Sequence, residues 1–147
     1  MARLPRCQPS KGKPVIGIVI VAHGGLAREY LAAVEHVVGK QPGMRAIAIE
    51  YDHDRGSKQA EICAAADAVD SGDGVVMVVD MFGGSPSNLS IAACCAADRR
   101  ILYGANLPML IKLAKSRSLS VPEASALALD AARKYIDSYE MSGGCGV

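Results

Sequence analysis

Short runs of Val and Ile alternate along the chain with longer stretches whose apolar residues recur at helical spacing. The first run, residues 15–22, is apolar at nearly every position, which is typical of a strand buried on both faces of a sheet. The stretch after it places Leu26, Tyr30, Leu31 and Val34 on one helical face. The pattern predicts strands over residues 15–22, 44–50, 75–79 and 101–104, and helices over 25–38, 57–69, 86–97, 106–115 and 122–139.

This alternation predicts an α/β fold, a single-domain open three-layer α/β/α sheet whose strands are mainly parallel. Parallel strands are joined by right-handed crossovers, and we expect the strand order 2-1-3-4. That order places the first and third strands side by side, with the topological switch point between them. The predicted organisation is a basic flexible leader over residues 1–14, one domain over 15–139 and a flexible tail over 140–147.

The composition fits this architecture and limits the classes of function. The chain has 147 residues, of which 50% are hydrophobic, with one Phe, five Tyr and no Trp, so we expect Ala-rich helices over a Val/Ile sheet. The net charge is +1, but residues 1–14 carry basic side chains only, and the remainder has 12 basic and 15 acidic residues. No basic stripe interleaved with aromatic residues is present, so nucleic-acid binding is not expected.

Neither membrane insertion nor secretion is expected. No apolar run approaches the roughly 20 residues of a membrane-spanning helix. The first run leads into His23 and two glycines rather than into the small-residue cleavage site of a signal peptide. The five cysteines form no Cys-x-x-Cys pair, and Cys63, Cys94 and Cys95 fall in Ala-rich helical stretches. These features favour a reducing, cytoplasmic location.

The first and third strands both end in a polar residue near a pair of glycines. The first run stops at His23, which Gly24 follows, and the third runs into Asp80 and a Gly-Gly-Ser-Pro turn over residues 83–86. The carboxyl ends of parallel strands meet at one edge of a sheet, where ligands bind. We therefore expect His23 and Asp80 to meet above the sheet.

These residue types are suited to the transfer of a phosphoryl group to nitrogen. Asp80 can accept the proton of one ring nitrogen of His23, which leaves the other nitrogen as a nucleophile. The N–H groups of Gly83, Gly84 and Ser85 would form a cradle for phosphate, and Ser85 is expected to cap the following helix. No Walker-type sequence is present, so the phosphoryl group is expected to arrive on another protein. No cofactor and no metal ion are expected.

Three segments of the chain resemble the IIA component of the mannose-family sugar phosphotransferase system (PTS). They are residues 18–24, residues 78–88 with an Asp-x-x-Gly-Gly-Ser-Pro block, and residues 104–110 with an Asn-x-Pro-Met-Leu block, and the likeness extends over residues 15–139. The site that the resemblance implies consists of the catalytic residues His23 and Asp80, the phosphate-binding residues Gly83, Gly84 and Ser85, and a site-adjacent loop of Gly24, Asn106, Pro108 and Met109.

The resemblance also implies partners. It implies a cytoplasmic phosphotransferase, a homodimer, that accepts phosphate from the histidine-containing phosphocarrier protein and passes it to a separate IIB component or to a regulatory target. It adds a short antiparallel strand near the C-terminal helix, exchanged across the dimer, which periodicity does not reveal. The chain departs from some relatives at Ala22, where they have Thr, and at Phe82, where they have Trp, and neither departure removes a catalytic group. No IIB domain follows Tyr139, so the acceptor is expected to be a separate chain.

Several functions remain open on this basis. The chain would act as a phosphotransfer intermediate in sugar uptake or as a regulatory binding module of an incomplete phosphotransferase system. The fold also resembles the phosphotransfer subunit of dihydroxyacetone kinase, which shares the chemistry. A tetrapyrrole metal chelatase would want a second histidine facing His23, and neither His36 nor His53 is well placed. We expect surface or packing roles for those two residues.

Overall fold

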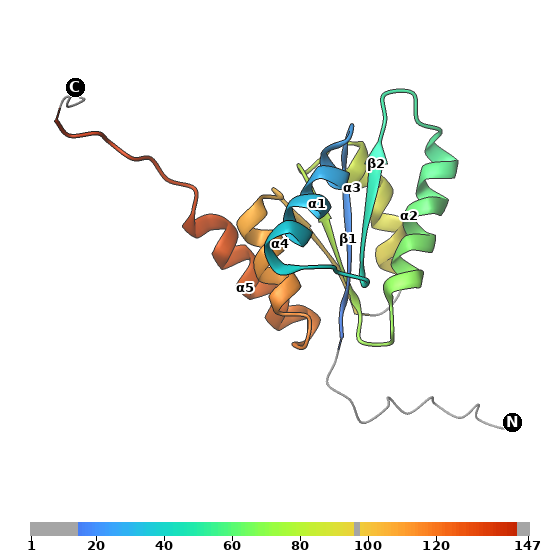
Figure 1. The fold of residues 1–147 in the computed structure, drawn as a ribbon. Coiled ribbons are helices and arrows are strands. Elements are labelled where there is room, and N and C mark those ends of the chain that lie inside the picture. Colours follow the sequence, from blue (N-terminus) through green and yellow to red (C-terminus); the bar gives the residue numbers. More distant parts are fainter. Residues whose placement is uncertain (1–14, 96–97, 144–147) are drawn as a thin grey trace, which may run out of the picture.

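A four-stranded parallel sheet forms the centre of the protein in the computed structural model, which describes residues 15–95 and 98–143 (Figure 1). Its strands are β1 (Gly17–His23), β2 (Met44–Ile49), β3 (Val75–Val79) and β4 (Arg99–Tyr103). Their order is β2-β1-β3-β4, and every neighbouring pair is parallel. The predicted α/β fold and strand order are confirmed, whereas the leader over residues 1–14 lies outside the described residues.

Helices cover both faces of the sheet (Figure 1). Because side chains of a strand alternate between its faces, Ile18 and Ile20 of β1 pack on one side, and Val19 and Val21 pack on the other. The first face carries α1 (Leu26–Val38), α4 (Leu107–Lys115) and α5 (Val121–Lys134), and the second carries α2 (Arg55–Val69), α3 (Ser85–Ser90) and the 3-10 helix η1 (Ile91–Cys95).

The register between β1 and β3 decides what meets at the carboxyl edge of the sheet. The two strands pair from Gly17 opposite Val75 to Val21 opposite Val79. His23, the last residue of β1, and Asp80, the residue after β3, therefore emerge at the same edge.

The second and third helices differ from their predicted bounds. The second begins at Arg55 rather than Ser57, because Asp54 caps it by accepting the Ser57 N–H at 2.8 Å. The third was predicted as one helix over residues 86–97, and it is instead a six-residue α-helix followed by η1. Its Ser90 hydroxyl donates to the Pro86 carbonyl oxygen at 2.6 Å, a bond from side chain to preceding turn that bends helices.

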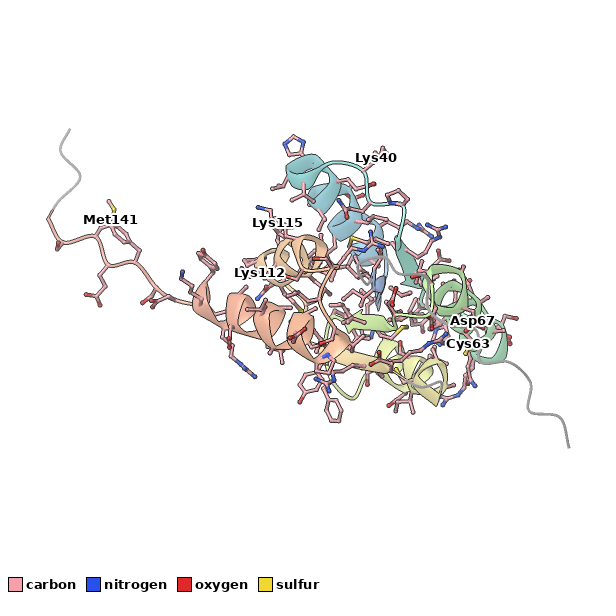
Figure 2. The ribbon with its side chains drawn as sticks, turned by 90° about the horizontal axis from the view of Figure 1, so that it is seen from below. Lys40, Cys63, Asp67, Lys112, Lys115 and Met141 are labelled. Atoms are coloured by element: carbon pink, nitrogen blue, oxygen red, sulfur yellow. The ribbon has the colours of Figure 1, made fainter. Side chains whose placement is uncertain are left out.

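The last helix ends at Lys134, five residues before the predicted end at Tyr139. Beyond it the chain is extended, and Met141 lies far from the body of the protein (Figure 2). The side chains of Ile136 and Tyr139 are 73% and 88% exposed. A helix that buries no apolar face loses most of its stabilisation, so it does not continue into this segment.

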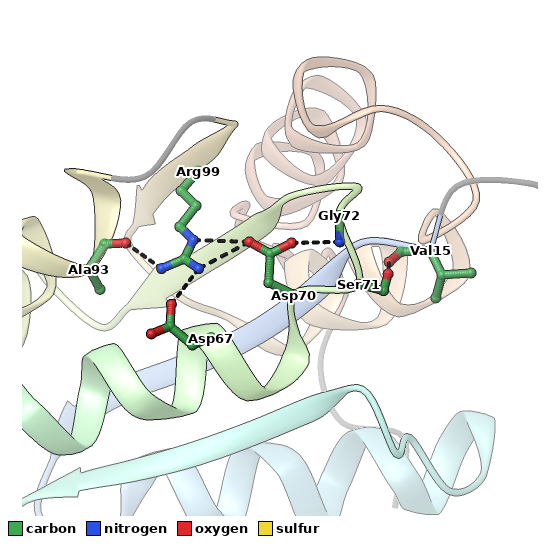
Figure 3. A network of polar contacts seen from close by, with 7 residues as sticks. All are labelled: Val15, Asp67, Asp70, Ser71, Gly72, Ala93 and Arg99. Atoms are coloured by element: carbon green, nitrogen blue, oxygen red, sulfur yellow. Dashed lines mark hydrogen bonds and ion pairs between the residues drawn. The ribbon is translucent and has the colours of Figure 1, made fainter. Parts of the chain in front are cut away.

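The fourth strand begins at Arg99, two residues before the predicted start, and the Arg99 side chain anchors it (Figure 3). The guanidinium is 6% exposed and lies 2.7 Å from Asp67 Oδ1 and 3.0 Å from Asp70 Oδ2, and it also donates to the Ala93 carbonyl oxygen at 2.9 Å. Burial alone raises the pKa of Asp70, but hydrogen bonds from the Gly72 N–H and from Arg99 outweigh it and hold the pKa below its ordinary value. This network joins α2, η1 and β4.

Within residues 15–95 and 98–143, none of the helices combines the length and the apolar composition that crossing a bilayer requires.

Replacing Arg99 with alanine is expected to lower the free energy of unfolding by about 2 kcal/mol, because Asp70 and the Ala93 carbonyl lose their donor. Urea denaturation at pH 7 measures the change. Arg100→Ala, at an exposed position of the same strand, is the matched control and should change the value by less than about 0.5 kcal/mol. Equal effects of the two substitutions would contradict the anchoring role.

The contribution of Arg99 to the free energy of unfolding also depends on pH. The pKa of Asp70 is lowered in the folded protein, so the stabilisation is fully present above the unfolded value of about 3.9 and is lost as the pH falls through the folded value. The difference in stability between the parent and Arg99→Ala should therefore shrink in acid.

Candidate functional site

The side chains of His23 and Asp80 meet at the carboxyl edge of the sheet, which confirms their predicted contact. Nδ1 of His23 lies 2.8 Å from Oδ2 of Asp80, and the same oxygen accepts the backbone N–H of His23 at 3.0 Å. The second carboxylate oxygen accepts the N–H of Met81 at 3.0 Å. Asp80 is thus held from both strands that supply the pair.

These bonds determine the ionisation of Asp80 and the tautomer of His23. Burial alone raises the pKa of Asp80, but the hydrogen bonds from His23 and Met81 outweigh it and place the pKa below its ordinary value. The ionised carboxylate can only accept hydrogen bonds, so Nδ1 of His23 carries the proton. In the neutral ring, Nε2 then presents its lone pair on a side chain that is 47% exposed, whereas the Asp80 side chain is only 14% exposed.

The turns that follow β1 and β3 depend on glycine. Gly24 has φ +56° and Gly83 has φ +85°, a left-handed conformation that other residues adopt at a cost. The Gly24 N–H donates to the Ile49 carbonyl oxygen at 2.9 Å, so the turn after His23 is also tied to the end of β2. The backbone therefore turns sharply beside both members of the pair.

The Gly-Gly-Ser turn lies against the imidazole, with one change from the prediction. A Cβ atom on Gly84 would lie 3.0 Å from Cε1 and 3.3 Å from Nε2 of His23, so only glycine permits this approach without displacing the ring.

Ser85 was predicted to cap α3, and that prediction is wrong: α3 begins at Ser85, Gly84 is its N-cap, and no side chain caps it. Ser87 instead accepts the Gly83 N–H through Oγ at 3.2 Å. Among the described residues, the N–H groups of Gly84 and Ser85 have no hydrogen-bond partner.

The residues predicted for the site-adjacent loop have separate structural positions. Asn106 caps α4 by accepting the Met109 N–H at 2.9 Å, and its amide donates to the Ala132 carbonyl oxygen of α5 at 3.0 Å. Met109 itself is 1% exposed and belongs to the core. Pro108 lines a cavity of about 530 Å³ between α4 and α5, which His23 does not line.

Three residues near the pair were not assigned to the site by the sequence pattern. Met81 donates its N–H to Asp80, and its side chain lies beside Gly84. Ser87 supports the turn. Tyr30 was predicted only as part of the apolar face of α1, although burial and then the negative charge of Asp80 raise its pKa. The sequence feature that could have pointed to Tyr30 is its position on the helix directly after His23.

The surface next to the pair is open and apolar. Met81, Phe82 and Tyr103 are 55%, 72% and 57% exposed, and the rings of Phe82 and Tyr103 are in contact at a tilt of 47°, with centroids 5.0 Å apart. No group of three His, Cys, Asp or Glu side chains suited to a metal ion occurs in the described part of the chain. The arrangement is a half-exposed imidazole beside exposed apolar side chains.

Comparisons with known proteins agree on one family. A family model described as "EIIA-man: PTS system fructose IIA component" matches residues 17–129. The chain is 30% identical over 126 residues to the PTS system mannose-specific EIIAB component of Escherichia coli (strain K12). That alignment covers 82% of this chain and 38% of the relative, so the chain spans well under half the length of the curated proteins that it matches.

Solved structures share the fold. The mannose/sorbose specific IIA subunit of the phosphotransferase system from Enterococcus faecalis has a TM-score of 0.78 at 22% identity, covering 89% of this chain and 99% of that chain. A putative phosphoenolpyruvate-dependent sugar phosphotransferase system permease from Klebsiella pneumoniae has a TM-score of 0.73 at 25% identity, covering 86% and 92%.

Replacing Asp80 with asparagine is expected to remove the preference of His23 for the Nδ1–H tautomer, because the neutral amide both donates and accepts hydrogen bonds. Nitrogen-15 chemical shifts of the imidazole measure the tautomer in the parent and the variant. The signals of His36 and His53 serve as internal controls and should not move. A His23 tautomer that is the same in both proteins would show that Asp80 does not determine it.

Proposed function

The chain belongs to the EIIA-man family of PTS IIA components, and we propose that it is a phosphotransferase that carries a phosphoryl group on Nε2 of His23. One observation carries the choice of atom: the Asp80 carboxylate binds Nδ1–H at 2.8 Å, so the exposed Nε2 is the nitrogen with a free lone pair. Histidine is nucleophilic near neutral pH when one nitrogen is unprotonated.

In the proposed step, the Nε2 lone pair attacks the phosphorus of a phosphohistidine on the donor protein. A new N–P bond forms at His23, the N–P bond of the donor breaks, and its electron pair returns to the donor nitrogen. The proton on Nδ1 stays in place, and Asp80 stabilises the positive charge that develops on the ring. Transfer of this kind needs mainly alignment and stabilisation of charge on the phosphoryl oxygens.

The proposed phosphate contacts come from the turn over residues 83–85. The N–H groups of Gly84 and Ser85 are the donors available for phosphoryl oxygens, and Gly84 already lies against the imidazole. Gly83 has its N–H bonded to Ser87, so its proposed part is to hold the turn in place. Asn106 and Gly24 support the same edge through backbone and capping bonds.

The proposed donor is the histidine-containing phosphocarrier protein, and the proposed acceptor is a IIB component or a regulatory target. The nucleophile lies on an open surface beside the exposed apolar side chains of Met81, Phe82 and Tyr103, which suits a protein donor better than a small molecule. A cytoplasmic location is part of this proposal, because the likeness to the IIA family implies it. The N–H groups of Gly84 and Ser85 beside the imidazole favour phosphoryl transfer over metal chelation, because N–H groups bind phosphoryl oxygens and cannot ligate a cation.

We also propose a homodimer in which the segment after α5 is exchanged as an antiparallel strand. Tyr135, Ile136, Tyr139 and Met141 are 65–88% exposed on this segment, which is a large apolar surface for an extended chain (Figure 2). Among the residues that the structure describes, β4 pairs only with β3, so its outer edge is available. Because α5 contacts β4, the segment that follows α5 begins near this edge, where the strand of a second copy can pair.

Phosphorylation at His23 is testable with purified proteins. The chain is incubated with phosphoenolpyruvate, the general phosphotransferase enzyme and the phosphocarrier protein, and the product is tested for acid-labile, base-stable phosphate. We expect label on the parent and on the His53→Ala control and at least a hundredfold less, roughly the background level, on His23→Ala. Absence of label on the parent with competent donors would refute the proposal.

The exchanged strand is testable by truncation. A chain that stops after Lys134 is expected to be a monomer, whereas a control that stops after Met141 should remain a dimer, with sedimentation velocity as the measurement. The fold should survive the truncation, because the hydrogen bonds of residues 135–143 are local and reach no farther back than the Arg133 carbonyl oxygen, which accepts the Ile136 N–H. A dimer of the shorter chain would exclude this strand as the interface.

A further inference from the structure

Tyr30 lies on α1, the helix that begins just after His23, and its hydroxyl makes a contact far along the chain. The hydroxyl donates to the Ala105 carbonyl oxygen at 3.0 Å in a partly buried position. Ala105 belongs to the turn between β4 and α4. This bond therefore joins α1, the helix that follows His23, to the turn beside the end of β3.

The backbone of Ala105 is held through its N–H group as well as through its carbonyl oxygen. Its N–H donates to the Val79 carbonyl oxygen at 3.1 Å, and Val79 is the residue directly before Asp80. The next residue, Asn106, is fixed by the capping bond to Met109 and by the bond to Ala132. Ala105 is thus a fixed point to which both Tyr30 and the end of β3 are attached.

These contacts close a ring around the candidate site. The chain runs from His23 through the start of α1 to Tyr30, a hydrogen bond leads to Ala105, and a second leads to Val79. Asp80 follows, and its carboxylate returns to Nδ1 of His23 at 2.8 Å. Movement of α1 relative to β3 would have to break one of these links.

We infer that Tyr30 is a positioning residue for the His23–Asp80 pair and that it acts through the Ala105 peptide. Its hydroxyl fixes the turn that supports the end of β3, and so it fixes the direction in which Asp80 leaves the sheet. The pKa of Tyr30, which is raised by burial and by the charge of Asp80, agrees with this placement. The inference depends on the proposed function only for its kinetic consequence.

The test is Tyr30→Phe, which keeps the ring and removes the hydroxyl. We expect a smaller fraction of the Nδ1–H tautomer of His23 by nitrogen-15 shifts and phosphoryl transfer that is slower by roughly three- to tenfold, the range to which one ordinary hydrogen bond corresponds. Tyr51→Phe is the matched control, because the Tyr51 side chain is fully exposed. Urea denaturation of both variants separates a general loss of stability from a local change.

The outcomes are distinct. A changed tautomer and a slower transfer in Tyr30→Phe, with an unchanged Tyr51→Phe, support the positioning role. An unchanged tautomer overturns it, whether or not the rate falls. If the parent takes no phosphate but the tautomer still changes in Tyr30→Phe, the proposed function fails and the positioning role stands.

Discussion

The parallel pairing of β1 with β3 is the constraint on which the candidate site depends. Both strands are fully buried along the paired stretch, so a change of register would expose apolar side chains and is strongly disfavoured. The register fixes where each strand ends, and the ends deliver His23 and Asp80 to one edge. The 2.8 Å contact between their side chains then determines which nitrogen of the imidazole is available.

The two edges of the sheet are stabilised by different interactions. At the amino edge, the buried guanidinium of Arg99 joins two carboxylates and a carbonyl group, and it fixes α2 and η1 against β4. At the carboxyl edge, backbone N–H groups and glycine turns hold the polar groups, and the His23 side chain stays half exposed. The first edge therefore supplies stability, while the second leaves the imidazole of His23 accessible.

The surface around His23 agrees with the proposed role, in which His23 exchanges a phosphoryl group with other proteins. The apolar side chains beside it are exposed, and the cavities of about 530 and 670 Å³ lie elsewhere, against α4–α5 and α1–β2. The extended segment after α5 presents further apolar side chains. Covering either surface with a protein partner would be favourable, because it removes apolar side chains from water.

The sequence alone predicted the fold class, the strand order and the contact of His23 with Asp80, because runs of Val and Ile mark the strands and right-handed crossovers leave few orders for parallel strands. Helix ends and capping did not follow from periodicity, because local side-chain bonds set them: Ser90 bonds to Pro86, and Ser87 rather than Ser85 supports the turn after β3. The link from Tyr30 to Ala105 spans 75 residues and could not be read from periodicity, which treats tyrosine as one more apolar position. Hydrogen bonds between distant segments depend on how the helices pack, and only the folded chain fixes that packing.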